Sequence, residues 1–104
     1  MTYKQAVLAR LRAATEALER IQRGESPTAK ELAAAPQLEW WCVTDSVPWP
    51  ELTGVVSGHP TLPDGTQIVT SKLLWLSDDR TSARTVSRFY RLGESFEKIL
   101  AARH

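Results

Sequence analysis

The sequence is poor in the residues that disulfides, metal sites and nucleotide loops require. Its 104 residues include a single cysteine, Cys42, and two histidines, His59 and His104. One cysteine excludes an intramolecular disulfide, and the cysteine and histidines lack the paired spacings of a structural zinc site. The five glycines never cluster into a phosphate-binding loop. We therefore expect no cofactor and no metal.

Long hydrophobic runs are also missing. Apolar runs such as Leu73 to Leu76 are four residues long at most, far short of the ~18 residues of a membrane-spanning helix. No basic, apolar and small-residue series of the signal-peptide type opens the sequence. These absences predict a cytoplasmic protein with no membrane partner.

Net charge is small, at +1, but it is unevenly distributed. Residues 36–79 hold six acidic side chains and one basic one, Lys72, whereas both flanking segments are net basic. Segregated charge of this kind favours a protein partner, or a second copy of the chain, over a general polyanion-binding surface.

The first 36 residues predict a helical hairpin. Tyr3 to about Arg23 should be a helix whose core-facing stripe comprises Val7, Leu11, Ala14, Leu18 and Ile21. On its other side, Glu16 with Arg20 and Glu19 with Arg23 have the spacing of ion pairs. Thr28 and Glu31 form a capping-box sequence for a short second helix that should reach Ala35.

The remaining residues predict a β-sheet and a final helix. Residues 38–92 should form an antiparallel sheet of three to four strands, able to curl into a half-barrel, with strands at Trp40–Thr44, Leu52–Gly58, Gln67–Leu76 and Ala83–Arg91. Ser95 can cap a C-terminal helix within 94–103. The predicted fold class is α+β, with residues 1–104 forming one domain.

Four tryptophans are the most informative apolar residues. We expect Trp41 and Trp75 in the core of the sheet. Trp49 lies in a Val-Pro-Trp-Pro loop, where prolines limit the entropy lost on docking. A large rigid aromatic in such a loop has the properties of an interface anchor, so Trp49 is our first candidate for partner binding.

Arginines provide the second candidate surface. On one extended strand, Arg84 and Arg88 would share a face with Tyr90. Two guanidinium groups beside a tyrosine can hold phosphates and stack a base. They can equally pair with the acidic middle segment, and we favour that pairing because the chain lacks the basic excess of nucleic-acid binders.

His59 is the most enzyme-like residue, because it is the one internal histidine and lies in a turn between strands. No nucleophile can be identified from the spacing, and Cys42 beside two tryptophans is typical of packing. We favour a structural role in which His59 bonds the adjacent loop, and keep a small hydrolase centred on His59 as an alternative.

One stretch of sequence carries a family resemblance. Gly58-His59-Pro60, Leu62-Pro63-Asp64-Gly65, Arg84-Thr85, Ser87-Arg88 and Tyr90-Arg91-Leu92-Gly93 follow one another between residues ~54 and 93. This pattern resembles small uncharacterised proteins of proteobacteria, their plasmids and their phages. The resemblance implies a small accessory protein of bacterial or phage origin and brings no activity and no functional residue.

Together these features predict a non-enzymatic protein-binding accessory module. By size and context, not by motif, we expect an inhibitor of a host defence complex, comparable to anti-CRISPR proteins. Its partner would be a protein, with a nucleoprotein complex included, and its contacts would come from Trp49, Arg84, Arg88 and Tyr90. The alternative is an RNA- or DNA-binding protein that uses Arg84, Arg88 and Tyr90. Its oligomeric state stays open.

Overall fold

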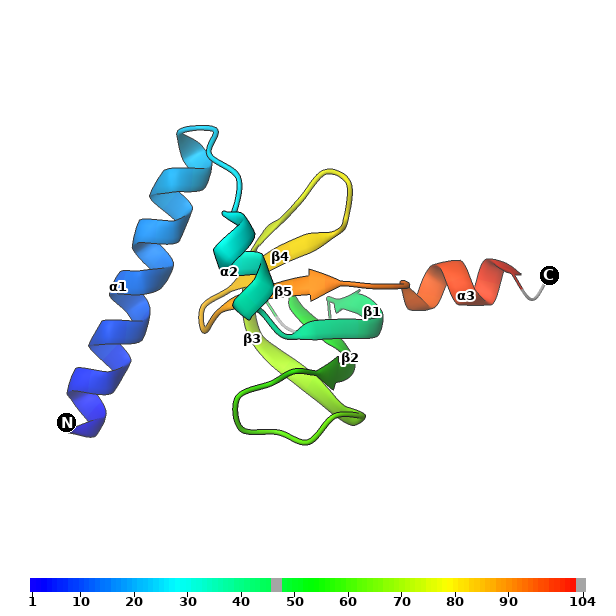
Figure 1. Cartoon of the computed structure of the whole chain (residues 1–104), viewed down its shortest axis with the longest axis horizontal. Helices are drawn as coiled ribbons and strands as arrows, with labels where there is room; N and C mark the ends of the chain where they lie inside the picture. Colours follow the sequence, from blue (N-terminus) through cyan, green and yellow to red (C-terminus); the bar gives the residue numbers. More distant parts are fainter. Residues whose placement is uncertain (46–47, 103–104) are drawn as a thin grey trace.

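The computed structural model describes residues 1–45 and 48–102 and has an α+β fold, as predicted. Two helices precede a five-stranded barrel and a third follows it (Figure 1). In chain order the elements are α1 (Tyr3–Gln22), α2 (Ala29–Ala34), β1 (Gln37–Thr44), β2 (Glu51–Ser57), β3 (Thr66–Leu76), β4 (Ser82–Thr85), β5 (Phe89–Leu92) and α3 (Phe96–Ala102).

The barrel is a closed meander. Consecutive strands pair in antiparallel fashion, and β5 closes the barrel by pairing with β1 in parallel, with Gln37 opposite Arg91 and Leu38 opposite Leu92. An odd number of alternating strands requires this parallel closure, because the first and last strands run the same way. The predicted sheet of three to four strands, curled into a half-barrel, is therefore corrected to a closed barrel of five strands.

The extra strand comes from a turn inside the predicted strand Ala83–Arg91. The hydroxyl oxygen of Thr85 accepts hydrogen bonds from the backbone N–H groups of Ser87 and Arg88, at 3.2 and 3.3 Å. The backbone N–H of Thr85 donates to the carbonyl of Arg88 at 2.9 Å. A threonine hydroxyl thus closes a hairpin without the glycine, asparagine or proline that usually signals one.

The barrel interior is filled by side chains that alternate along the strands. Leu38 and Leu52 are fully buried at its centre, with Trp41 at 2% exposure. The prediction for Trp41 is confirmed. Trp75 is half-buried and lies in a second cluster outside the barrel, where Ala17, Ala35 and Phe89 are buried. This outer cluster attaches the two N-terminal helices to the barrel.

Helix α1 packs through its C-terminal half only. Ala14 and Ala17 are buried, whereas Leu8 and Leu11 are 51% and 46% exposed. Placing Leu11 on a core-facing stripe was therefore wrong. A 20-residue helix is about 30 Å long, whereas the four residues of β4 cover about 13 Å. Figure 1 shows the N-terminal half of α1 slanting away from the barrel.

An ion pair ties α1 to α2. The guanidinium of Arg20 donates to both carboxylate oxygens of Glu31, at 2.9 and 2.7 Å. These bonds replace the expected pair of Arg20 with Glu16, and Arg23 pairs with Glu25 in place of Glu19. The capping box of Thr28 and Glu31 is confirmed. The hydrogen bonds from Arg20 hold the pKa of Glu31 at about 2, below its ordinary 4.5.

The Arg20–Glu31 pair makes stability depend on pH. Because the folded-state pKa lies below the unfolded one, the contribution is complete above about pH 4.5 and is lost as pH falls through about 2. We expect Glu31→Gln to reduce the free energy of unfolding at pH 6 and to have much less effect at pH 2.5, by urea denaturation. Glu16→Gln, on the exposed side of α1, is the control. Equal losses at both pH values for Glu31→Gln would contradict this account.

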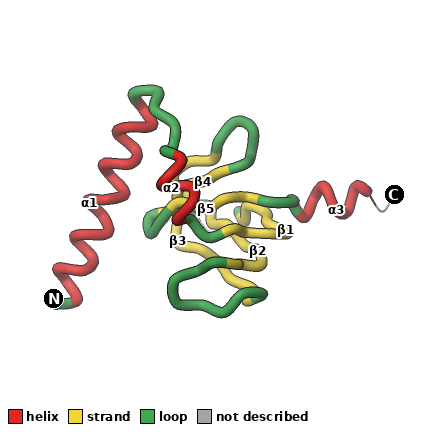
Figure 2. Tube along the Cα trace, viewed as in Figure 1, coloured by secondary structure: helices red, strands yellow, loops and turns green. Residues whose placement is uncertain are grey.

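Helix α3 lies on the side of the barrel opposite α1 and projects outward (Figure 2). The side-chain oxygen of Ser95 accepts the backbone N–H of Lys98 at 3.1 Å, as expected of its cap. Phe96 and Leu100 remain 46% and 43% exposed. Among the residues described, no helix combines the length and apolar character that crossing a bilayer requires.

Candidate functional site

A bulge in β1 turns Trp40 out of the barrel. Glu39 pairs with Val55 and Cys42 with Thr53, so that Trp40 and Trp41 together oppose the single residue Gly54. Two residues facing one define a β-bulge. Trp40 adopts a φ of 51°, unusual for a bulky residue, and its side chain is 59% exposed.

Gly54 makes this bulge possible. A Cβ at Gly54 would lie 2.8 Å from the carbonyl oxygen of Glu39 and 2.8 Å from Cγ of Leu38. Both distances are shorter than van der Waals contact, so only glycine allows β1 to approach β2 so closely.

The bulge borders a groove of about 300 Å³ on the outer face of β1 to β3. We call it the Trp40 groove; its lining residues are Trp40, Cys42, Thr53, Gly54, Val55, Gln67 and Phe96. Val69, which pairs with Thr53 across β2 and β3, is 64% exposed. The outer barrel face therefore presents two aromatic rings and a valine to solvent, where polar side chains are the rule.

Trp49 lies beside β3. Its indole N–H donates to the carbonyl of Leu73 at 3.0 Å, and the side chain remains 53% exposed. The role of Trp49 as an interface anchor stays a prediction. Residues 46 and 47 of the same loop lie outside the described residues.

The structure separates Arg84 and Arg88 from Tyr90. Both arginines line a cavity beneath α2, whereas Tyr90 is 3% exposed and belongs to the barrel core. Burial raises the pKa of the Tyr90 hydroxyl. A ring enclosed in the core cannot stack on a base. The prediction that Tyr90 could stack on a base is therefore wrong.

The favoured ion pairs of these arginines are also absent. Neither Arg84 nor Arg88 has a carboxylate within ion-pair distance among residues 1–45 and 48–102. Glu51 pairs with Lys72 at 3.0 Å. Asp79 accepts hydrogen bonds from Ser77 and Thr81, which lower its pKa. Glu51 and Asp79 of the acidic middle segment are thus engaged by neighbouring residues and not by these arginines.

His59 forms hydrogen bonds with the adjacent loop, which is the structural role that the sequence favoured. Its Nδ1 accepts the backbone N–H groups of Thr61 and Leu62, at 3.1 and 3.2 Å. An accepting Nδ1 is unprotonated, and burial together with the charge of Arg88 lowers the pKa of this histidine. Of the side chains described, only the Thr61 hydroxyl is within hydrogen-bond distance of the ring, at 3.3 Å. The contacts of His59 are those of a turn residue.

Sequence reasoning missed Trp40 and the cavity beneath α2. The signal for Trp40 was present in the Trp40-Trp41 pair, because neighbouring strand residues face opposite ways and Trp41 was assigned to the core. The cavity had no such signal, because α1, α2 and the β4–β5 hairpin meet there only in the folded chain.

Comparison with family models matches residues 6–103 to a family of unknown function (DUF6634). The chain belongs to this family. Searches of the curated proteins and of the solved structures gave no match. Membership of DUF6634 agrees with the expected resemblance to an uncharacterised family. The matched segment contains both the Trp40 groove and the cavity beneath α2.

Proposed function

We propose that this DUF6634 protein is a non-catalytic protein-binding module and that the Trp40 groove is its principal contact surface. One observation carries the proposal: a tryptophan held at a φ of 51° with 59% of its side chain exposed. Strained backbone of this kind costs about 1–3 kcal/mol and persists where the surroundings enforce it, most often at functional sites.

The chemistry of the tryptophan side chain also supports a protein-binding role for the Trp40 groove. Tryptophan is enriched among interface residues whose truncation costs more than about 2 kcal/mol, and such residues occupy pockets with apolar surroundings. Phe96 and Val55 supply those surroundings in the Trp40 groove. Trp49 and the exposed leucines of α1 add contacts for a partner large enough to reach them.

The proposed accessory role and the proposed lack of catalysis are supported by other observations. A cytoplasmic accessory role in phages or mobile elements, including inhibition of a host defence complex, rests on chain length and on the resemblance of residues ~54–93. The non-enzymatic reading is supported by the hydrogen bonds of His59, whose Nδ1 is occupied by backbone donors.

Binding measurements with a matched pair of variants test the proposal. A partner is first captured from native cells on the immobilised full chain, then purified and titrated by calorimetry. We expect Trp40→Ala to weaken binding of the partner by at least about 2 kcal/mol, because the complex loses an aromatic anchor that the partner would bury. Leu62→Ala, which truncates an exposed side chain in the 58–65 loop, should leave the affinity unchanged.

Two results would overturn the assignment. A folded Trp40→Ala protein that binds with parental affinity excludes the Trp40 groove as the contact. Retention of nucleic acid alone, with affinity that falls steeply as salt rises, would instead support the nucleic-acid alternative.

A further inference from the structure

The cavity beneath α2 has a volume of about 310 Å³ and a different character from the Trp40 groove. Ala13 of α1 and Glu31 of α2 form one side, and Arg84, Ser87 and Arg88 of the β4–β5 hairpin form the other. We call it the arginine pocket.

Arg84 is the most unusual residue of the arginine pocket, because its charged side chain is only 7% exposed. Its Nε donates to the carbonyl of Thr85 at 2.9 Å, and its guanidinium carbon lies 4.9 Å from the ring centre of Phe89. The two Nη groups have no hydrogen-bond acceptor in the described part of the chain. No side-chain nitrogen of the described residues is both buried and unpartnered, so these Nη groups are open to solvent and can reach an anion that enters the pocket.

No carboxylate of the described residues lies within ion-pair distance of Arg84. Glu31 is the acidic residue of the pocket lining, and both of its oxygens already accept hydrogen bonds from Arg20. Arg88 adds a second positive charge to the lining. Burial lowers the pKa of Arg84, the carboxylate of Glu31 raises it and the charge of Arg88 lowers it, so the protein offsets the charge of Arg84 only in part.

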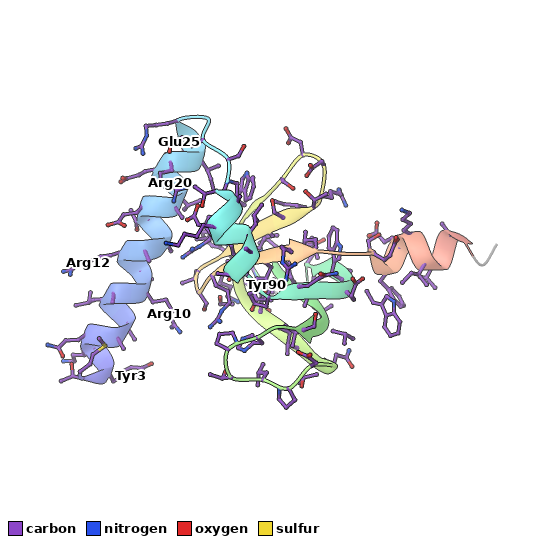
Figure 3. The ribbon with its side chains drawn as sticks, viewed as in Figure 1. Tyr3, Arg10, Arg12, Arg20, Glu25 and Tyr90 are labelled. Atoms are coloured by element: carbon purple, nitrogen blue, oxygen red, sulfur yellow. The ribbon has the colours of Figure 1, made fainter. Side chains whose placement is uncertain are left out.

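Helix α1 carries another cation, Arg10, on the side that faces the barrel. Arg10 precedes Ala13 and Ala14 by three and four residues, so it shares their helical stripe. Figure 3 shows the side chain of Arg10 directed toward the barrel and that of Arg12 directed away from it. Arg12 therefore offers a matched control: an exposed arginine on the same helix that faces away from the pocket.

We propose that the arginine pocket binds the phosphate group of inorganic phosphate or of a small phosphomonoester. Guanidinium groups bind phosphate through pairs of parallel hydrogen bonds, which the free Nη groups of Arg84 can supply. A dianion matches the two positive charges of Arg84 and Arg88 better than a carboxylate does. The site is separate from the Trp40 groove, so the proposal does not rest on the proposed function.

Titration of the ¹⁵N-labelled full chain with inorganic phosphate at constant ionic strength tests the site. We expect saturable amide shifts in Ser87, Arg88 and Phe89 and in α2, and a rise in melting temperature relative to chloride. Arg88→Gln should weaken phosphate binding at least tenfold, whereas Arg12→Gln should change it less than twofold. Arg84→Gln should abolish the saturable shifts; if it does not fold, Arg88→Gln decides.

Parallel titrations identify the source of the anion. Tighter binding of glycerol 3-phosphate than of phosphate would indicate a phosphomonoester ligand, and the reverse would indicate free phosphate. The proposal is overturned if phosphate and glycerol 3-phosphate produce no saturable shifts, if acetate binds as well as phosphate, if only single-stranded RNA binds, or if Arg12→Gln weakens binding as much as Arg88→Gln.

Discussion

Replacing Leu52 by alanine is expected to lower the free energy of unfolding by about 3–5 kcal/mol. Leu52 is fully buried inside the barrel, so truncation removes packed methyl groups and leaves a cavity that the closed sheet cannot collapse to fill. Urea denaturation of the parent and the variant at pH 7 measures the difference.

Leu11→Ala provides the comparison, because it makes the same chemical change on a side chain that is 46% exposed. We expect a loss below about 1 kcal/mol, since little apolar area returns to water and alanine favours the helix. Equal losses for Leu52→Ala and Leu11→Ala would mean that α1 packs along its whole length, contrary to the structure.

Gly54→Ala is expected to destabilise the protein by about 2–3 kcal/mol and to displace Trp40. The added Cβ would lie 2.8 Å from the Glu39 carbonyl oxygen, and a backbone atom cannot swing away as the end of a flexible side chain can. Relief therefore requires β1 to move at its bulge, which changes the environment of the neighbouring indole. Thermal unfolding and the indole N–H resonance of Trp40 report the two effects.

Gly24→Ala separates strain from crowding. Gly24 has a φ of 87°, and no atom lies within 4 Å of the place that an added methyl group would occupy, so alanine there costs conformational energy alone, about 1–2 kcal/mol. We expect this variant to lose stability while the Trp40 resonance stays unchanged. An unaltered Trp40 resonance in Gly54→Ala would show that the bulge does not depend on the missing side chain.

Helix and strand periodicity was enough to predict the fold class. The capping residues Thr28 and Ser95 and the apolar alternation of β2 act over a few residues, and the structure confirms them. Two expectations failed because they depend on distant parts of the chain. Leu11 has the right spacing for a core residue, but the N-terminal half of α1 slants away from the barrel and leaves it exposed. Thr85 starts a hairpin through its hydroxyl, which composition does not reveal.

In the candidate site, too, features set by neighbouring residues could be predicted and features set by distant parts of the chain could not. The turn role of His59 followed from its position, whereas the flanking prolines made Trp49 a candidate anchor without fixing its exposure. The environment of Arg84 could not be predicted, because an arginine on a strand is usually solvated and its burial arises from the packing of α1 and α2 over the hairpin. Trp40 was missed although the Trp40-Trp41 pair indicated it, whereas the bulge that sets its backbone depends on Gly54 in another strand and could not be predicted.

The parallel pairing of β5 with β1 also has a mechanical consequence. The chain enters β1 from α2 at Gln37 and leaves β5 toward α3 at Leu92, and these two points lie side by side in the closing pair. Because α1 and α3 lie on opposite sides of the barrel (Figure 1), tension between these outer helices runs along this pair. Such a load shears the bonds from Arg91 N–H to Pro36 and from Gly93 N–H to Leu38 simultaneously, where an antiparallel closure would let them unzip in turn. Partners bound to α1 and α3 would therefore load the β1–β5 pair that closes the barrel, and the rate of forced unfolding would set its resistance to that load.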